Sequence, residues 1–274
     1  MFVNKYGLFH YQNQSNVVDT KLLKNDEITF SVLVSILQNE CTSIYTDHEN
    51  IVICLSMLPY PVWVWCKNVN DRELVSKIAA CLKEEFPFEK GHTYNLSYEL
   101  LEQLIKTDEY FQQCKIEMNL LSYRLDEMQK INVSCDGGME PARVEELDYL
   151  IALWHDLCLE MAHVEYDEEF CRKAVLAHLA AGTLFSWRNA RDELVALTSK
   201  GDVNCYSKVS SVYTLPKYRR KGYAINLVAR VTENILETER IPILYTDANY
   251  GASNSCYKKI GYEEVGSLCT VGIK

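Results

Sequence analysis

The chain has 274 residues, of which 48% are hydrophobic, and its formal net charge is −10 at pH 7. This length fits one large domain or two ordinary ones, and the hydrophobic content favours a packed core over disorder. Divided after Leu125, the chain has 11 basic and 16 acidic residues in the first part and 17 and 22 in the second, so each part is −5. A nucleic-acid-binding protein needs a broad basic surface, so we expect no nucleic-acid partner.

The cysteines and the first residues indicate a cytoplasmic protein. The two closest of the 11 cysteines, Cys54 and Cys66, are twelve positions apart, so the chain has no C-x-x-C pair. Reduced, buried thiols fit this spacing, and the six histidines show no ligand spacing, so no metal is expected. Residues 1–6 lack the order of a signal peptide, and the apolar stretch 51–65 is too short to span a bilayer.

The first part of the chain has a mixed α and β pattern without a catalytic signature. Helical periods are expected over 29–39, 71–85 and 97–112. Two β-type runs, 51–55 and 62–65, flank a turn that contains Pro59 and Pro61. A further strand over 115–125 would lead out of this part.

The second part begins with a short strand-like run, 131–135, followed by the polar stretch Asp136-Gly137-Gly138. An amphipathic helix with Ile151, Trp154 and Cys158 on its apolar face is expected next, and then a helix over 168–180 that Gly182 ends. We place His178 on the apolar face of this helix as a packing residue. The remaining pattern predicts strands at 183–187, 193–198, 209–214 and 243–246, helices after Gly222 and before Gly261, and a closing strand or strand pair over 264–273.

A cationic glycine turn precedes the helix that starts after Gly222. Four of the five residues 217–221 are Lys or Arg in an otherwise acidic chain. Free amides at a helix start, and the helix dipole, favour an anion. The order strand, basic turn, helix therefore predicts a phosphate-binding site, in which Gly222 would let the backbone approach the ligand.

Two motifs about thirty residues apart resemble the signatures of the GNAT acyltransferase superfamily. Arg219-x-x-Gly222-x-Ala224 resembles its Gln/Arg-x-x-Gly-x-Gly/Ala pyrophosphate motif. Residues 250–262 resemble its second motif, with five positions in register: Ser253, Asn254, Tyr257, Gly261 and Tyr262. The usual leading Asn-Pro is absent, because Tyr250 and Gly251 stand there.

The resemblance implies an α/β (α+β mixed) protein of two domains. Over residues 128–274 the element order β-α-α-β-β-β-α-β-α-β is that of the GNAT fold, a central mixed sheet flanked by helices. Residues 1–127 would form a divergent N-terminal mixed α/β domain, for which a degenerate GNAT-like half is one interpretation. The phrases Phe185-Ser186-Trp187 and Leu244-Tyr245-Thr246-Asp247 are typical of a bacterial two-part subgroup of the superfamily.

By the same resemblance, acetyl-CoA would be the acyl donor. Its pyrophosphate would lie on the loop and the first helical turn, and backbone groups of a strand end would pair with its pantetheine arm. The implied cofactor-binding residues are Val212, Tyr213, Thr214, Arg219, Arg220, Lys221, Gly222, Tyr223, Ala224 and Asn254. Tyr257 is the candidate general acid, which would protonate the departing thiolate.

The general base and the acceptor are not identified by the sequence. Glu160, Glu165 and Asp167 lie in or near the loop between the first two helices, and Asp167 suits a helix cap. A water chain to a distant carboxylate would serve as well. The oligomeric state is open between monomer and homodimer.

Three functions are compared. The first is an acetyl-CoA-dependent N-acetyltransferase that acts on a primary amine of a small or amino-acid-like acceptor by direct attack in a ternary complex, with a peptide or protein N-terminus as the other acceptor. The second is a catalytically silent CoA-binding sensor or interaction protein. The third, a structural module without a ligand, conflicts with the basic turn.

Overall fold

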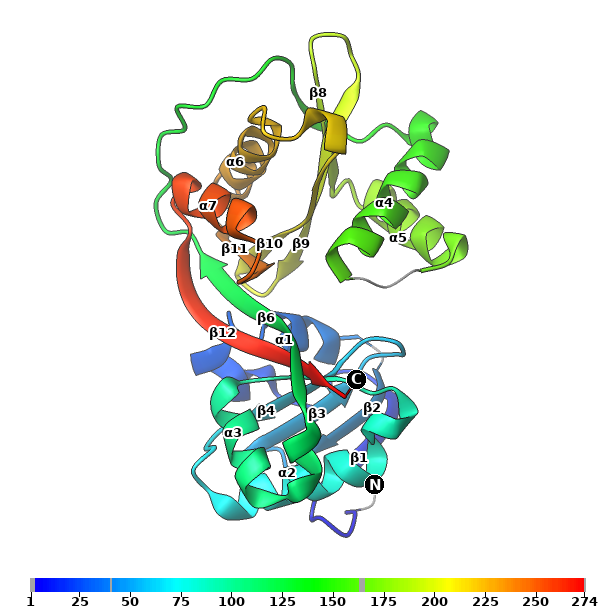
Figure 1. Cartoon of the computed structure of the whole chain (residues 1–274), viewed down its shortest axis with the longest axis vertical. Coiled ribbons are helices and arrows are strands. Elements are labelled where there is room, and N and C mark those ends of the chain that lie inside the picture. The colour runs from blue at the N-terminus through cyan, green and yellow to red at the C-terminus, as the bar shows by residue number, and fades with distance from the viewer. Residues whose placement is uncertain (1–2, 40, 163–165, 274) are drawn as a thin grey trace. The chain divides into compact units, whose positions relative to one another are not determined.

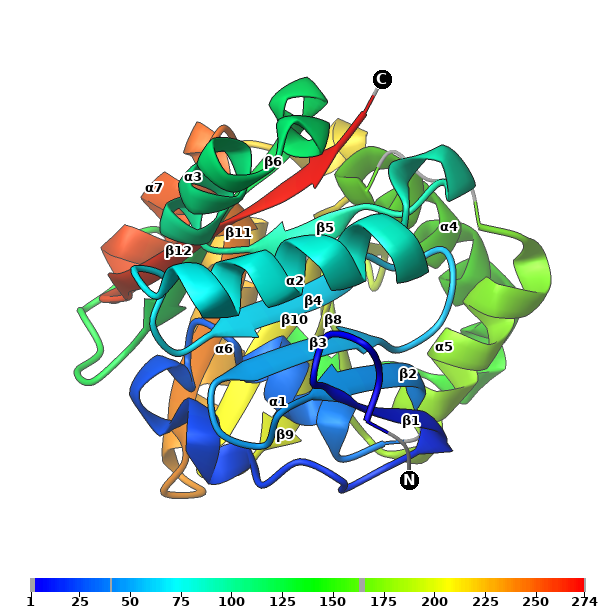
Figure 2. The same ribbon diagram turned by 90° about the horizontal axis from the view of Figure 1, so that it is seen from below.

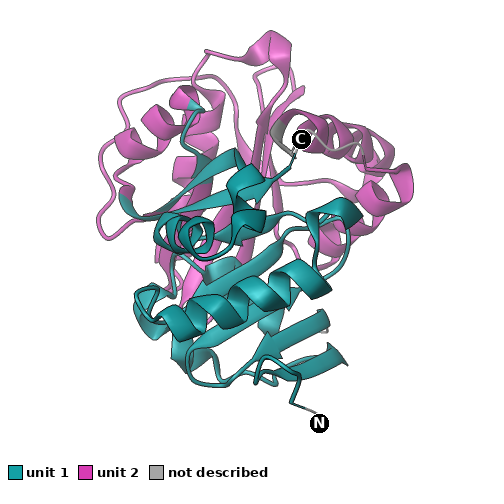
Figure 3. Cartoon of the chain, turned by 60° about the horizontal axis from the view of Figure 1, so that its bottom comes forward, with its two compact units in different colours: residues 1–122, 246–250, 264–274 teal, residues 123–245, 251–263 magenta. Residues whose placement is uncertain are grey.

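The computed structural model describes residues 3–39, 41–162 and 166–273, with the side chains of residues 161 and 162 left out. These residues form two compact units (Figure 3). Unit 1 contains residues 1–122, 246–250 and 264–274, and unit 2 contains residues 123–245 and 251–263. The chain therefore leaves unit 2 twice, the second time for its last strand.

Unit 1 is a mixed sheet with helices, and its core lies between the sheet and α2 and α3. Its strands follow the order β1-β2-β3-β4-β5-β12-β6. Figure 2 shows α2 lying across β3 and β4. The bounds are β1 Phe9–Gln14, α1 Ser31–Leu37, β2 Cys41–Thr46, β3 Ile51–Leu55, β4 Val62–Cys66, α2 Arg72–Glu85, β5 Tyr94–Leu96, α3 Tyr98–Thr107, β6 Lys115–Arg124 and β12 Glu263–Gly272.

Unit 2 is a sheet of order β11-β10-β9-β8-β7 between two helix pairs. Figure 1 shows α4 beside α5 on one face of β9 and β10, and α6 beside α7 on the other. The bounds are β7 Gly138–Pro141, α4 Leu147–Ala162, α5 Glu168–Ala180, β8 Leu184–Arg188, β9 Leu194–Val203, β10 Tyr206–Thr214, α6 Tyr223–Leu236, β11 Ile241–Asp247 and α7 Gly251–Ile260.

The two halves of the chain repeat one order of elements. Each half has a strand, a helical segment, three further strands, a helix, a strand, a helix and a last strand. The pairing repeats as well. The first four strands of each half pair antiparallel, and the fourth and fifth, β4 with β5 and β10 with β11, pair parallel. The mixed α/β class is thus confirmed, and the repeat agrees with the interpretation of the first half as a degenerate copy of the second.

The last strand of the second half does not stay with unit 2. β12 pairs antiparallel with β5, where Cys269 faces Leu96, and it is one continuous strand instead of a pair. The predicted domain boundary at 127/128 stays a prediction, because the compact units divide the chain after Ser122 and count residues 264–274 with the first.

The strand expected at 131–135 is not formed, and β7 lies at Gly138–Pro141 instead. β7 has a partner in β8, with Met139 opposite Trp187. In the run 131–135, the carbonyl of Val133 accepts a hydrogen bond from the Asn226 side chain at 2.9 Å, so it meets a helix and not a strand. A strand needs a neighbouring strand to pair with, and the apolar residues of 131–135 do not indicate whether such a neighbour is present.

Candidate functional site

The site is built first on β10, whose ladder with β11 stops before β10 ends. The two strands pair in parallel from Tyr206 opposite Ile241 to Val209 opposite Leu244, and β10 continues to Thr214. On the other side, the register with β9 shifts between Ser210 and Tyr213. Ser211 has a φ of 55°, so the strand bulges there. The last residues of β10 therefore extend past the β11 ladder.

The loop after β10 leads into α6 with two left-handed residues. Arg220 has a φ of 60° and Gly222 a φ of 85°, and α6 begins at the next residue, Tyr223. Within the described structure no side chain caps this helix start, and its first turn contains no acidic residue. The first amides of a helix have no acceptor inside the helix. An anion at this position would receive hydrogen bonds and the favourable end of the helix dipole.

Gly222 is required for a reason that differs from the expected one. A Cβ at this position would lie 2.8 Å from Cγ1 of Val133 and 3.5 Å from the carbonyl oxygen of Ser134. The glycine thus permits the left-handed conformation and the close packing of segment 133–134. The direction that a Cβ would take is filled by the protein itself, not by a ligand.

The cations of the loop differ in their surroundings. Arg220 and Lys221 are exposed, and the Lys221 ammonium lies 5.3 Å from the centroid of the Tyr218 ring. Lys217 lies over the same ring at 4.7 Å. The Tyr218 hydroxyl donates to Glu193 at 2.8 Å, which holds the ring that both lysines approach. The loop thus holds its positive charge beside the start of α6.

Arg219, the first residue of the motif, is engaged elsewhere. Its Nη2 donates to the Glu160 carboxylate at 2.6 Å, and its Nε donates to the carbonyl of Thr214 at 2.9 Å. Its guanidinium carbon lies 5.7 Å from the centroid of the Tyr213 ring. The side chain thus joins the end of α4, the end of β10 and the loop.

The first residues of α6 are anchored by their side chains. The Tyr223 hydroxyl bonds to Asp136 at 2.5 Å, which raises the pKa of Tyr223 to about 12 and lowers the pKa of Asp136. Asp136 also accepts from the amide of Ala190 at 2.9 Å. Asn226 bonds to the carbonyl of Gly222 at 2.8 Å. Because the Tyr223 side chain is held by Asp136, we expect Tyr223 to contact a ligand through its backbone amide.

The second motif divides into packing residues and candidate chemical residues. Gly261 has a φ of 112°, and a Cβ there would lie 2.5 Å from the carbonyl oxygen of Glu127. The Tyr262 hydroxyl is 2.8 Å from Oγ1 of Thr232 in the core of unit 2. Both residues therefore attach α7 to its surroundings.

Tyr257 and Asn254 lie three positions apart on α7, and so on one face of it. Asn254 is half-buried. The Tyr257 side chain is 7% exposed, and burial raises the pKa of its phenol. A phenol with a raised pKa keeps its proton at neutral pH, as a proton donor must.

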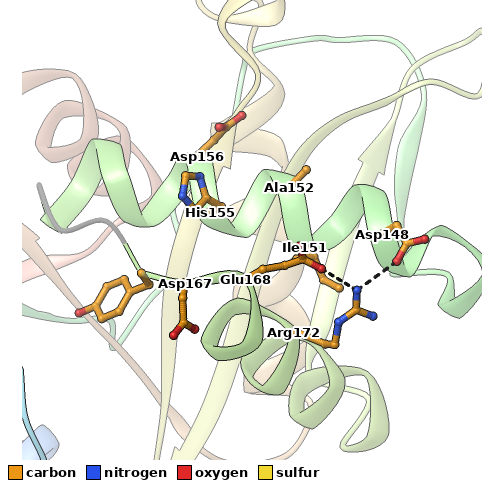
Figure 4. A pocket seen from close by; sticks show the side chains of 9 residues that line it. Asp148, Ile151, Ala152, His155, Asp156, Asp167, Glu168 and Arg172 are labelled. Carbon is orange, nitrogen blue, oxygen red and sulfur yellow. Dashed lines mark hydrogen bonds and ion pairs between the residues drawn. The ribbon is translucent and has the colours of Figure 1, made fainter.

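A groove of about 900 Å³ lies between α4 and α5 (Figure 4). Its carboxylates are Asp148, Asp156, Asp167 and Glu168, and Arg172 is its one guanidinium, so these five side chains carry a formal charge of −3. Arg172 pairs with Glu168 at 2.9 Å and with Asp148 at 3.5 Å. Asp167 accepts from the amide of Phe170 at 2.8 Å, which confirms it as the cap of α5. Glu165 lies outside the described residues.

The remaining candidates are structural. His178 is 2.8 Å from Oγ1 of Thr183 and packs on Trp154, which confirms it as a packing residue. Among the described residues, no group of three or more His, Cys, Asp or Glu side chains could hold a metal ion. No helix in the described part of the chain is long and apolar enough to cross a membrane.

Comparisons with known proteins agree with this geometry. The family model described as FR47-like protein matches residues 190–271. A solved structure of a GCN5-related N-acetyltransferase from Sphaerobacter thermophilus has a TM-score of 0.68 at 9% identity and covers 98% of this chain and 96% of its own. A GNAT-family acetyltransferase from Colwellia psychrerythraea has a TM-score of 0.61 at 11% identity, with 97% and 100% covered. The chain has the GNAT acetyltransferase fold.

One further solved structure is similar, and the comparison with curated proteins found no match. A Drosophila protein has a TM-score of 0.64 at 13% identity and covers 92% of this chain and 89% of its own. No curated protein matches the sequence significantly. The GNAT fold is thus confirmed over nearly the whole chain, the family model matches residues 190–271, and the roles of single residues stay predictions.

The sequence missed the roles of two residues, and one pairing, that shape this site. Ser211 forms the bulge of β10, and the small pair Ser210-Ser211 in a strand of larger residues was its only signal. Asp136 anchors both Tyr223 and the β8–β9 turn, but an Asp-Gly-Gly stretch indicates only a loop. The pairing of Glu160 with Arg219 joins residues 59 positions apart, and no local pattern predicts such a pair.

Proposed function

We propose that this chain is an acetyl-CoA-dependent N-acetyltransferase that acetylates a primary amine of a small or amino-acid-like acceptor. The observation that carries the proposal is the start of α6, which no side chain caps among the described residues, and which has two left-handed residues before it and exposed cations beside it. The order of elements and the likeness to GNAT structures support it.

The donor would be held at two places. The backbone amides from Lys221 to Ala224 would donate to its pyrophosphate, with added charge from Arg220 and Lys221. The pantetheine arm would pair with residues 212–214, which extend past the β11 ladder, as an added strand pairs with a sheet edge. The bulge at Ser211 turns the backbone there, and one amide of this segment would polarise the thioester carbonyl.

Transfer would proceed by direct attack in the ternary complex. The neutral amine nitrogen of the acceptor attacks the thioester carbon, and the C–N bond forms as the carbonyl becomes an oxyanion. When the oxyanion collapses, the C–S bond breaks, and the Tyr257 phenol gives its proton to the leaving thiolate. The attacking nitrogen loses its proton through water to a carboxylate, and the proton that Tyr257 gave is replaced from solvent. Asn254, on the same face of α7, would bind the arm.

A cationic amine is the acceptor class that the surroundings favour. The groove of α4 and α5 carries an excess of carboxylates, and a charged amine gains by approaching such a surface. An amino-acid-like molecule or a peptide N-terminus would both meet this condition. Glu160 is not proposed as the base, because its carboxylate accepts from Arg219.

The test is calorimetric titration of the ligand-free protein with acetyl-CoA and with CoA. We expect one site per chain, and a Lys221→Ala variant should bind roughly tenfold more weakly, since a hydrogen bond to a charged group is removed. Lys173→Ala removes an exposed lysine of α5 and is the matched control. Thiol release with a panel of primary amines then separates an enzyme from a silent binder. Correctly folded protein that binds neither molecule would overturn the proposal.

A further inference from the structure

We propose that Arg219 is a positioning residue, whose side chain joins the end of α4 to the arm-binding end of β10 through Glu160 and Thr214, and does not itself bind the pyrophosphate. The inference deepens the proposed function and rests on it. It assigns roles to Arg219 and Glu160 that a count of the charges in the loop does not predict.

The geometry gives Arg219 three partners at once. Nη2 reaches the Glu160 carboxylate at 2.6 Å, and Nε reaches the Thr214 carbonyl at 2.9 Å. The guanidinium also lies over the Tyr213 ring. A planar guanidinium that donates from two of its nitrogens and lies against a ring face is fixed in orientation. A phosphate ligand would have to compete with the Glu160 carboxylate for this guanidinium.

The partners belong to different parts of unit 2. Glu160 stands near the end of α4, and Thr214 is the last residue of β10. Tyr213 is 6% exposed and packs in the core that α4 and α5 share with β8 and β9. Arg219 thus fixes the last turn of α4 beside the strand segment that would hold the thioester arm. An acceptor must reach the carbonyl along one side of that segment, so this pair would fix one wall of its path.

The charges around Tyr213 agree with this arrangement. Burial raises the pKa of Tyr213, Asp156 and Glu160 raise it further, and Arg219 lowers it. Glu160 and Arg219 therefore act on the same ring with opposite sign. Their side chains are 34% and 38% exposed, so the ion pair is neither buried nor fully solvated. An ion pair of this kind contributes modestly to the stability of the fold. Its importance lies in the positions that it gives to the end of α4 and the end of β10.

The two roles of Arg219 make opposite predictions for Glu160. If Arg219 positions the arm strand, Arg219→Gln and Glu160→Gln should each weaken CoA binding by the same factor, about two- to fivefold. The double variant should be no weaker than either single variant. If Arg219 binds phosphate instead, Arg219→Gln weakens binding alone, and Glu160→Gln leaves it unchanged or tightens it by releasing the guanidinium.

The experiment is calorimetric titration of the full chain with CoA for wild type, both single variants and the double variant. Arg230→Gln, which removes another Arg–Glu pair of unit 2, is the matched control and should bind as wild type. Hydrogen exchange in residues 150–160 of the ligand-free proteins is a readout that needs no donor. It should rise equally in Arg219→Gln and Glu160→Gln and no further in the double variant.

The outcomes separate this inference from the proposed function. Equal loss in the two single variants, with no further loss in the double variant, is the expected result. Loss in Arg219→Gln alone, or no change in either single variant, overturns the inference while wild-type binding keeps the proposed function. Wild-type protein that binds no CoA overturns the proposed function itself.

Discussion

Asp71 and Gly222 occupy the same place in the two halves of the chain, immediately before the helix that follows the fourth strand. The Asp71 carboxylate accepts from the amides of Glu73 at 2.9 Å and Leu74 at 3.3 Å. Within the described structure, Gly222 leaves the first amides of α6 without such a side-chain cap. The first half thus fills with its own carboxylate the position at which the proposed function places an anion in the second half.

Replacing Asp71 should therefore affect stability and not ligand binding. Asp71→Ala removes the cap of α2 and should lower the free energy of unfolding by about 1 kcal/mol. The stoichiometry of CoA should stay at one per chain, since the proposed site is on α6. Urea unfolding and calorimetric titration measure the two effects, and a loss of CoA affinity comparable to that of Lys221→Ala would contradict this division of roles.

Gly222→Ala should destabilise unit 2 through two separate effects. A non-glycine residue in the left-handed region costs about 1–2 kcal/mol, and the contact with Val133 adds to this cost. Gly182→Ala is the matched control, because Gly182 also has a positive φ but has nothing within 4 Å of its Cβ direction. The melting temperature should be lower for Gly222→Ala than for Gly182→Ala. Adding Val133→Ala to Gly222→Ala should remove this difference. Equal effects of the two single variants would show that the Val133 contact costs nothing.

Tyr257→Phe should reduce turnover and leave donor binding intact. Removing a general acid lowers the rate by about a hundredfold or more, while the ring still packs against Tyr262 and Tyr123. Turnover is measured as thiol release from acetyl-CoA with an amine that the wild type accepts.

The control for this prediction is Tyr262→Phe, a second buried tyrosine of the same motif. It removes the hydrogen bond between Tyr262 and Thr232, whose hydroxyl still donates to the carbonyl of Val228, and should cost about 1 kcal/mol of stability. Its turnover per folded molecule should equal that of the wild type. If Tyr257→Phe turns over as fast as Tyr262→Phe, the phenol of Tyr257 is not the proton donor.

The Asp136–Tyr223 contact predicts a dependence of stability on low pH. The folded protein lowers the pKa of Asp136, chiefly through the Tyr223 hydroxyl. The folded state therefore binds a proton less readily than the unfolded chain, whose aspartate pKa is about 3.9. The stabilisation is present above that pKa and is lost as pH falls through the lower folded value. Asp136→Asn should be less stable than wild type at neutral pH, and urea unfolding should show the difference shrinking below about pH 4. A difference that stays constant down to low pH would exclude this linkage.

The fold of the second half was largely predictable because its elements are long and periodic. Leu227, Val228, Val231 and Ile235 lie on the buried face of α6 as expected. The basic loop and the helix start were also placed correctly, since four cations and a glycine are a local signal. β5 has only three residues, and a three-residue strand has no recognisable period.

The rest of the site depends on pairings that no local pattern contains. The bulge at Ser211 arises from the register between β9 and β10, and the place of β12 beside β5 depends on tertiary packing. The role expected for Gly222 was wrong in its reason, because the nearby Val133 comes from a segment 89 residues earlier in the chain. The sequence thus located the basic loop and the helix start, and it did not predict the contacts that hold them in place.

The most direct test of the central claim is calorimetric titration with acetyl-CoA of wild type, Lys221→Ala and the Lys173→Ala control. We predict one site per chain, affinity roughly tenfold lower in Lys221→Ala, unchanged affinity in Lys173→Ala, and a weaker salt dependence in the loop variant. Binding that is the same in all three proteins would contradict an anion site at the start of α6. No binding in folded wild type would contradict the acetyltransferase proposal itself.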